Sequence, residues 1–475
     1  MKILIIGAGP AGLTAGYELV KSGHQVIILE KEGQVGGISK TINYHGYLFD
    51  LGGHRFFTKY EQVEKIWKEV LPNDFIKRPR LSRIYYNGKF FYYPLRPFNA
   101  LINLGPVKAT KAVLSYLRVR IKPYPDPQTF DQWVTNKFGC QLYQTFFKTY
   151  TEKVWGIPCN QISADWAAQR IRGLSLSKAI LNAFGLTGKS KIRTLIEEFL
   201  YPRRGPGQFW EKMAELIERK GGQIILQAEA IQIKHTGKSL MITAKIKDRM
   251  EEFTADRLIS SAPLKETILT LNPQPPEEVC KAAESLKYRD FFTVCLIINK
   301  PDLFPDNWVY IHSPEIIAGR MQNFKNWSPE MIPDQAHTSL GLEYFCFSSD
   351  PIWSLPESNL IETAILDIEK LKLAERNDIT DGTIVRVPKA YPVYDPNYKR
   401  QIEKIRFYLD QVPLIQVIGR NGLHRYNNQD HSMMMGLYAA WNIPEKKHPI
   451  WDINVEEEYH EEKQDQIPLS INLDK

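Results

Sequence analysis

Three glycines near the N-terminus have the spacing of a phosphate-binding turn. Gly7, Gly9 and Gly12 form the pattern GAGPAG. The first glycine permits a tight turn, the second lets the backbone approach a pyrophosphate, and the third lets a helix pack on a strand. Glu30 follows Gly12 by eighteen residues, where its carboxylate can accept hydrogen bonds from ribose hydroxyls. The pattern predicts a dinucleotide site, and an ordinary glycine turn is the alternative.

Further glycine pairs indicate which dinucleotide is bound. Gly36 and Gly37 follow Glu30 closely, in the segment KEGQVGGIS. A pair in this position is typical of large FAD proteins and uncommon in nicotinamide enzymes. Gly52 and Gly53, in FDLGGHRFF, could bring backbone close to an isoalloxazine ring. These pairs favour FAD.

The sequence on either side of these glycines predicts the strands and helices that position them. Residues 2–6 (KILII) predict a strand, AGLTAGYELVKSG predicts a helix, and QVIILE predicts a second strand, which together form a βαβ unit. Residues 222–232 and 240–262 return to strand character. Near the C-terminus, PLIQVIGRNG and HSMMMGLYAAWNI predict a strand followed by a helix.

The rest of the chain predicts two other kinds of structure. Residues 100–190 have helical spacing, and four runs between about 290 and 390 predict an antiparallel sheet whose face could floor a substrate cleft. The predicted fold class is α/β: a Rossmann-type FAD-binding domain with a helical insertion and an antiparallel substrate-binding sheet. The predicted bounds are 1–75, 195–275 and 410–445 for a discontinuous FAD domain, 100–190 for the helical insertion, 76–99 and 276–409 for the sheet domain, and 446–475 for a polar, mobile tail.

Composition limits the classes of function. The chain has 475 residues and a formal charge of +7, without a basic block long enough for a nucleic-acid tail. Basic residues cluster locally in 77–83 and 202–205, where they could face phosphate or only solvent. The five cysteines form no CxxC pair, which predicts free thiols, a cytoplasmic location and no metal site. No run of eighteen apolar residues occurs, so no membrane span is expected.

The chain resembles the flavin amine oxidase superfamily, including its protoporphyrinogen oxidase-like members, and within it most resembles UDP-galactopyranose mutases of the eukaryotic type. The N-terminal signature is shared by the whole superfamily. More specific segments are FDLGGHRFF, TFDQW, YTEKVWGIP, YPRRGPGQFW, GRMQNFKNWSP and GRNGLHRYNNQDHS. The resemblance covers nearly the whole chain, and it implies FAD that is active when reduced. No cysteine or histidine occupies a motif known for covalent flavin attachment, so the FAD is expected to be non-covalent.

The resemblance also implies site residues. Arg170 and Arg320 match arginines that grip a substrate diphosphate, and His54 matches a histidine beside the flavin. Taken alone, Arg170 could simply be solvated. The implied FAD-binding residues are Gly7, Gly9, Gly12, Glu30, Gly36, Gly37, Gly52, Gly53, Gly419, Arg420, Gln429 and Asp430. The implied substrate-binding residues are Tyr93, Arg96, Trp155, Trp308, Tyr310, Trp327, Tyr391, Tyr426 and Asn428.

Some of these positions have other readings. Tyr391, Trp308 and Tyr310 could equally be core aromatics of a sheet. Trp327 stands where the mutases carry a tyrosine, and Arg96 stands where they carry a glutamine. Both departures touch the nucleotide end of the substrate, so the nucleotide or the sugar could differ.

The activity implied by the resemblance is interconversion of UDP-galactopyranose and UDP-galactofuranose, or of a similar nucleotide sugar, through N5 of the reduced flavin. Its implied partners are the nucleotide sugar and an electron donor such as NAD(P)H, with no nucleic acid, and its implied setting is cell-surface polysaccharide biosynthesis. One alternative is an FAD-dependent oxidoreductase of the amine oxidase or protoporphyrinogen oxidase type. Another is a non-catalytic flavoprotein that binds a nucleotide sugar.

Overall fold

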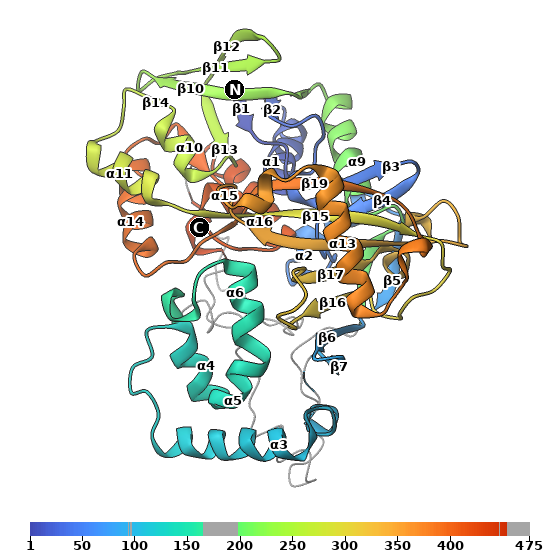
Figure 1. The fold of residues 1–475 in the computed structure, drawn as a ribbon. Coiled ribbons are helices and arrows are strands. Elements are labelled where there is room, and N and C mark those ends of the chain that lie inside the picture. The colour runs from blue at the N-terminus through green and yellow to red at the C-terminus, as the bar shows by residue number, and fades with distance from the viewer. Residues whose placement is uncertain (94, 96, 165–197, 446, 454–475) are drawn as a thin grey trace.

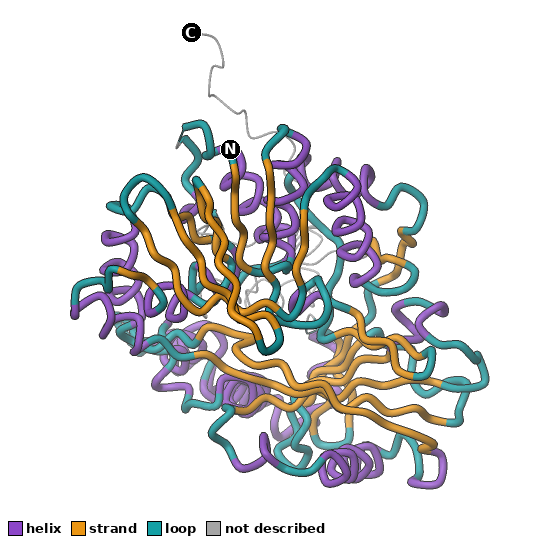
Figure 2. The backbone as a smooth tube through the Cα atoms, turned by 90° about the horizontal axis from the view of Figure 1, so that it is seen from above, coloured by secondary structure: helices purple, strands orange, loops and turns teal. Residues whose placement is uncertain are grey.

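The fold is taken from a computed structural model that describes residues 1–93, 95, 97–164, 198–445 and 447–453. Figures 1 and 2 show two large sheets that lie next to each other, with helices packed around them. The predicted α/β fold class is confirmed.

The first sheet is parallel and assembles distant parts of the chain in the order β20-β13-β1-β2-β9. Its strands are short, apolar and largely buried, as expected for a sheet covered on both faces. Their bounds are β1 (Lys2–Ile6), β2 (Gln25–Leu29), β9 (Gln223–Ile225), β13 (Arg257–Ser260) and β20 (Ile415–Val417).

Four helices from different parts of the described chain pack together at this sheet. Helix α1 contacts both α9 and α16, and α9 also contacts α2. The close approach of α1 and α16 depends on Gly436, because a Cβ there would lie 2.4 Å from the carbonyl oxygen of Ala11. The bounds are α1 (Pro10–Lys21), α2 (Glu61–Val70), α9 (Pro206–Arg219) and α16 (Gln429–Trp441).

A smaller sheet has four strands in the order β12-β11-β10-β14. Its first strand in the chain, β10, comes directly after β9. Helices α11 and α14 pack on each other and contribute buried side chains to the same core as the parallel sheet. The bounds are β10 (Ala228–His235), β11 (Leu240–Ile246), β12 (Arg249–Ala255), β14 (Leu271–Asn272), α10 (Leu264–Leu269), α11 (Glu277–Ser285), α14 (Tyr398–Leu409) and α15 (Gly419–Gly422).

The second large sheet has seven strands in the order β19-β15-β18-β17-β16-β6-β7. Its pairs are antiparallel except for β16 with β6, which run parallel. The bounds are β6 (Ser82–Tyr86), β7 (Lys89–Tyr92), β15 (Tyr288–Ile298), β16 (Trp308–Ile311), β17 (Arg320–Asn323), β18 (Thr338–Cys346) and β19 (Ile379–Pro392), with helices α12 (Phe324–Trp327) and α13 (Glu357–Leu371) beside it.

Two small pairs of strands link the large sheets: β3 (Thr41–Tyr44) pairs with β4 (Tyr47–Asp50), and β5 (Phe75–Pro79) pairs with β8 (Glu198–Pro202). The β5–β8 pair brings the two basic segments noted in the sequence near each other. The described part of the predicted insertion is helical: α3 (Pro97–Ile121), α4 (Phe130–Phe138), α5 (Cys140–Leu142), a π-helix (Tyr143–Lys148) and α6 (Thr149–Trp155). The exact domain bounds stay a prediction, and most of the predicted tail lies outside the described residues.

In the described ranges no helix is long and apolar enough to cross a membrane. Within the same residues, no group of three or more His, Cys, Asp or Glu side chains is arranged to hold a metal ion.

Candidate active site

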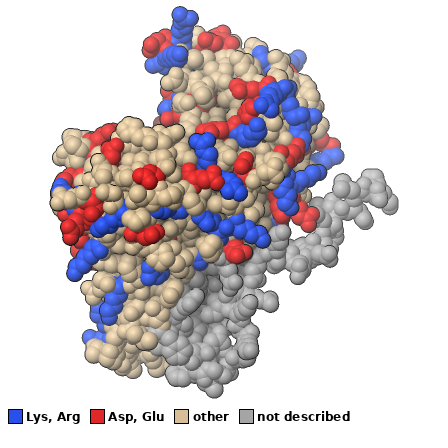
Figure 3. All heavy atoms as spheres, turned by 90° about the vertical axis from the view of Figure 1, so that its right-hand side faces the viewer, with Lys and Arg blue, Asp and Glu red and all other residues tan. Residues whose placement is uncertain are grey.

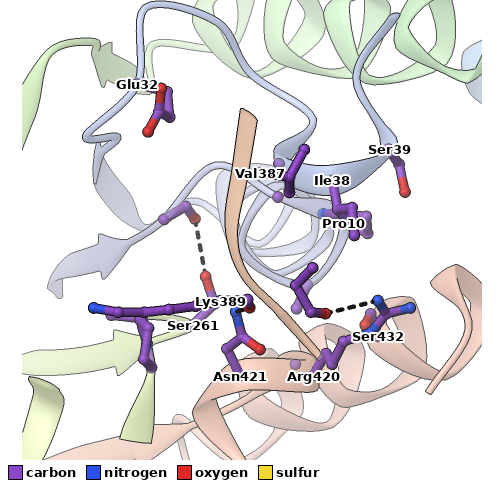
Figure 4. A pocket seen from close by; sticks show the side chains of 18 of the residues that line it. Pro10, Glu32, Ile38, Ser39, Ser261, Val387, Lys389, Arg420, Asn421 and Ser432 are labelled. Carbon is purple, nitrogen blue, oxygen red and sulfur yellow. Dashed lines mark hydrogen bonds between the residues drawn. The ribbon is translucent and has the colours of Figure 1, made fainter. Parts of the chain in front are cut away.

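A cavity of about 650 Å³ lies at the carboxyl ends of the parallel strands. Ile6 and Leu29 end β1 and β2, and Ser261 and Gly419 follow β13 and β20; all four line the cavity. Ligands of open α/β sheets bind at this edge. The opposite wall comes from β19 of the second sheet, which crosses the cavity in Figure 4 and carries Val387 and Lys389.

The glycine turn at the start of α1 has the geometry that the sequence predicts for it. Gly7 adopts a φ of +94° and donates its N–H to the Leu29 carbonyl at 2.8 Å. A Cβ on Gly12 would lie 1.9 Å from the Gly7 carbonyl oxygen, so this position requires glycine. Gly9 lines the cavity, and the nearest atom to a Cβ there would be 3.8 Å away. The first turn of α1 is therefore accessible to a phosphate.

Glu30 lies at the same end of the cavity and is only 7% exposed. Its carboxylate accepts hydrogen bonds from the backbone N–H groups of Ala8 (2.6 Å) and Glu32 (2.9 Å). Burial raises the pKa of Glu30, although these two hydrogen bonds oppose that shift. Each oxygen keeps a second lone pair, so the carboxylate can still accept a hydrogen bond from a ribose hydroxyl.

A second helix begins at the cavity. Asn428 caps α16 in a reciprocal arrangement with His431, and Asn428, Gln429 and Ser432 line the cavity. Gln429 donates to the carbonyl of Arg55 at 2.8 Å, and among the described residues its Oε1 has no partner. The first turns of α1 and α16 thus both meet the cavity, and each offers positive potential to an anion.

Arg320, on β17, lines the far part of the cavity and is held by a buried carboxylate. Its Nε donates to Oε1 of Glu343 at 2.7 Å, and its Nη2 donates to Oε2 of the same side chain. Glu343 is fully buried and also accepts from Gln322 at 2.9 Å. Burial opposes the charge of Arg320, but the ion pair with Glu343 outweighs it and raises the pKa of the guanidinium above its usual value. Arg320 is therefore a fixed cation at this end of the cavity.

His54 lies close enough to two cations for their charges to act on it. It lines the cavity on the loop that contains Gly52 and Gly53, and a Cβ on Gly52 would lie 3.3 Å from the imidazole and 3.6 Å from Arg320. Burial, and then the charges of Arg420 and Arg320, lower the pKa of His54 to about 3. The imidazole is neutral near pH 7, so one ring nitrogen donates and the other accepts.

Two tyrosines stack beside Arg320. The rings of Tyr391 and Tyr426 are 5.8 Å apart and nearly parallel, and the guanidinium of Arg420 lies 5.3 Å and 4.8 Å from their centres. Arg420 also donates to the carbonyls of Ala390 and Asn427. Two backbone carbonyls thus fix the position of the Arg420 side chain, and its guanidinium contacts both tyrosine rings.

The predicted aromatic residues form a layer next to this end, behind the cavity lining. In β16 and β17, Tyr310 is directly opposite Arg320. Tyr310 contacts Tyr93 and Trp308, with ring centres 5.1 Å and 6.3 Å apart. Trp155 is buried and contacts Tyr391 at 6.4 Å. None of these four aromatic side chains is among the cavity-lining residues that the structure describes.

Trp327 requires a correction. It is 1% exposed, stacks on Trp308 and donates its indole N–H to the Asn307 carbonyl at 2.9 Å. The indole N–H is therefore already used within the core and is not available to a substrate, so Trp327 does not act as a polar substrate-binding residue. The ring instead packs against Gly53, where a Cβ would approach it to 3.4 Å.

The other predicted residues divide into three groups. Arg170 and Arg96 lie outside the described residues. Gly12, Gly36 and Asp430 support the site from behind the lining. The predicted residues that line the cavity are Gly7, Gly9, Glu30, Gly37, Gly52, Gly53, His54, Arg320, Tyr391, Gly419, Arg420, Tyr426, Asn428 and Gln429.

Sequence reasoning missed two residues of this region. Lys389 is placed by a bulge of β19: its φ is +53°, its N–H donates to Asp290 at 2.6 Å, and its ammonium pairs with Glu266 across the cavity lining. The proline before it, Pro388, is the signal that could have indicated a bulge. Tyr150 stands 5.5 Å from Tyr310 and lies close to Arg320, and it begins the segment YTEKVWG.

These residues fit a flavin dinucleotide. Two helix N-termini can receive the pyrophosphate, and Glu30 can receive a ribose. Buried polar atoms at His54, Asn421 and Gln429 have no partner within the described part of the chain, so they are available to a polar ring system. No cysteine is found among the described lining residues.

The chain belongs to the family of flavin containing amine oxidoreductases, whose model matches residues 10–396. The curated proteins that are similar to it include the following three. The chain is 25% identical over 322 residues to an L-amino-acid oxidase of Crotalus adamanteus, covering 63% of this chain and 58% of the relative. It is 28% identical over 177 residues to a probable UDP-galactopyranose mutase of Klebsiella pneumoniae (34% and 43%), and 32% identical over 176 residues to a dTDP-fucopyranose mutase of Escherichia coli (34% and 44%).

The aligned regions thus span about three fifths of the oxidase and less than half of each mutase. Among solved structures, that of a reduced UDP-galactopyranose mutase has a TM-score of 0.81 at 24% identity, and the match covers 93% of this chain and 95% of that one. This likeness establishes the fold. Together with the family, it makes the chain an FAD-dependent protein of the flavin amine oxidoreductase class.

Proposed function

We propose that this protein is an FAD-dependent mutase that interconverts the pyranose and furanose forms of a nucleotide sugar, with UDP-galactose as the first candidate. The observation that carries the proposal is the charge at the Gly52–His54 end of the cavity. The charges of Arg320 and Arg420 act on the neutral His54 there, close to two stacked tyrosines. Guanidinium groups and phenols are suited to the oxygens of a diphosphate.

Arg320 would bind the substrate diphosphate and stabilise it as the leaving group. Its Nε and Nη2 are used by Glu343, which leaves Nη1 and the cavity-facing edge of the guanidinium for the substrate. Tyr391 and Tyr426 would donate to the same phosphates. Arg170 would add a second guanidinium, as the resemblance implies. Electrostatic stabilisation of a departing group from fixed positions commonly contributes the largest part of such catalysis.

His54 would contact the flavin rather than exchange protons. Since its pKa is about 3, it is poorly suited to general acid catalysis near neutral pH. Bound, non-covalent FAD in its reduced form would supply a nucleophilic N5 for chemistry at the anomeric carbon of the sugar. The work of the chain is then to orient the substrate, compensate its charge and exclude water.

The names of relatives support this assignment and leave the sugar open. One relative carries the name UDP-galactopyranose mutase and another the name dTDP-fucopyranose mutase. The departures at Arg96 and Trp327 concern the nucleotide end, so the nucleotide is also part of the proposal. A cytoplasmic location, an electron donor such as NAD(P)H and a place in cell-surface polysaccharide synthesis are proposed with it.

One observation favours a second function. The match to the L-amino-acid oxidase covers 63% of this chain, compared with 34% for the mutases. An FAD-dependent oxidoreductase of that type would use Arg320 to bind a substrate carboxylate. This alternative predicts oxygen consumption with an amino acid or amine, which the mutase does not require.

The deciding experiment is anaerobic. The flavin-loaded protein is reduced with dithionite and given UDP-galactofuranose, and UDP-galactopyranose is measured by chromatography, with oxidised protein as the control. Turnover by the reduced protein alone is the expected result. No turnover with UDP-galactose or with dTDP-fucose, from protein that retains flavin, would contradict the mutase assignment. Hydrogen peroxide formed from amino acids would favour the oxidase.

A further inference from the structure

Helix α3 lies at the end of the molecule farthest from the parallel sheet (Figure 1). One side of this helix packs on α4, α5 and β7. On that side Ala112 is buried, and Ser115 accepts a hydrogen bond from the backbone N–H of Gln141 at 3.1 Å. A Cβ on Gly139 would lie 2.7 Å from the backbone nitrogen of Tyr116, so the helix is tightly seated.

The opposite side of α3 is apolar and exposed. Val107, Leu114, Leu117 and Ile121 are spaced by seven, three and four residues, so they form one stripe along the helix. Their exposed fractions are 67%, 60%, 50% and 86%. The stripe points away from the buried Ala112, because Leu114 is two residues, or about 200°, further round the helix. The fold covers one apolar side of this helix. The second apolar side is exposed, which indicates an interaction surface.

Basic side chains border this stripe. Lys111, Arg118 and Lys122 follow one edge with spacings of seven and four, and Lys108 and Arg120 add two further charges. Residues 97–125 contain no Asp or Glu. Among the described residues, none of these five basic side chains forms an ion pair with a carboxylate. In the face shown in Figure 3, the lower end of the molecule carries Lys and Arg but no visible Asp or Glu.

We propose that the stripe of α3 (Val107, Leu114, Leu117 and Ile121) with its basic border docks the protein on an anionic membrane surface. An amphipathic helix with branched aliphatic residues on one side and Lys or Arg along its edges lies in the plane of the interface and buries its apolar side among the acyl chains. The basic border favours an anionic membrane over a second copy of the chain as the binding partner, because two such helices would bring like charges together. Anionic headgroups complement the border instead.

The helix would lie on the surface and not cross it, because its outer side alone is free. The rest of the fold keeps the cavity away from the bilayer, since α3 is at the end of the molecule farthest from the parallel sheet, whose strand ends line the cavity (Figure 1). The nucleotide site would then face the aqueous phase while the protein is held near a membrane. This inference does not depend on which sugar, or which flavin reaction, the protein handles.

The test uses the flavin-loaded, full-length protein and sucrose-loaded vesicles, either of phosphatidylcholine alone or with an equal part of phosphatidylglycerol. Sedimentation with the anionic vesicles at low ionic strength, and little with the neutral ones, is expected. Lys111→Gln/Arg118→Gln should weaken partitioning roughly 25-fold, at about fivefold for each basic residue. Leu114→Gln/Leu117→Gln should weaken it by on the order of tenfold or more, because two aliphatic side chains no longer enter the acyl region.

Phe407→Gln is the matched control, since Phe407 is 73% exposed on α14, away from the stripe. Every variant is first checked for wild-type circular dichroism and bound flavin, so that misfolding is separated from lost docking. Wild-type protein that stays in solution with anionic vesicles would overturn the proposal. So would stripe variants that sediment like the wild type, or variants that change only the oligomeric state in analytical ultracentrifugation, which would assign the stripe to a second copy.

Discussion

The ion pair of Arg320 and Glu343 allows a quantitative prediction. Glu343 is fully buried, and the side chain of Arg320 is 18% exposed toward the cavity. Glu343→Gln keeps the shape of the side chain but leaves the guanidinium without its countercharge. Breaking a buried pair by removing one partner costs ~3–5 kcal/mol, and the cavity-facing edge of Arg320 places the expected loss near the lower value, ~3 kcal/mol. Because the entropy of unfolding reaches roughly 1 kcal/mol/K for a chain of 475 residues, this loss corresponds to about 3 °C in Tm.

The assay is urea unfolding of the wild type, Glu343→Gln, Arg320→Gln and the double variant, all at the same flavin concentration, because bound ligand adds its own stabilisation. The double variant should be more stable than the sum of the two single losses implies, with a coupling of ~2 kcal/mol or more, since removing both charges leaves neither buried alone. A Glu343→Gln protein within ~0.5 kcal/mol of the wild type, or purely additive losses, would refute this account of the site.

Three other predictions concern groups around the cavity. Burial raises the pKa of Asp50 from 3.8 to about 7, so the folded protein favours the neutral carboxyl. The free energy of unfolding should therefore fall as the pH rises from 3.8 to about 7. Asp50→Asn should make this pH dependence weaker in urea unfolding. Burial lowers the pKa of His54 from 6.5 to about 3, so stability should fall as the pH drops from 6.5 toward 3, and NMR should find a neutral ring at about pH 5.5; a protonated ring would contradict the assignment. Lys389 lines the cavity, so Lys389→Gln removes a positive charge there and should weaken FAD retention by about two- to fivefold in a flavin-release assay, the range of an exposed charge pair. Lys212→Gln removes an ion pair on α9 and should leave retention unchanged.

The nucleotide end of the site was predictable because its chemistry is local in sequence. Gly7, Gly12 and Glu30 lie within one βαβ unit, and each is fixed by a backbone constraint that a short pattern expresses. The α/β class followed from the same unit together with the alternation of strands in the second half. The antiparallel pattern did not indicate the parallel pairing of β16 with β6, since pairing between distant strands is set by the tertiary fold.

The other end of the site was only partly predictable. Glu343 holds Arg320, but the two lie 23 residues apart on different strands, and no spacing rule connects them. Residue type could not separate Tyr391, which lines the cavity, from Trp327, whose N–H is used in the core. Nor could periodicity distinguish the covered side of α3 from its exposed stripe, because both sides are apolar.

The strand order of the parallel sheet has a consequence for synthesis of the chain. Strand β1 is made first, but its neighbour β13 ends at residue 260, and the edge strand β20 and helix α16 arrive only after residue 414. At roughly 5–20 residues per second, about 20–80 seconds pass between the synthesis of β1 and that of β20 and α16. During that interval the apolar surface of α1 that α16 later covers stays open, and the cavity lacks one of its two helix N-termini. Nascent chains should therefore depend on chaperones, and FAD should be captured only after helix α16 has left the ribosome.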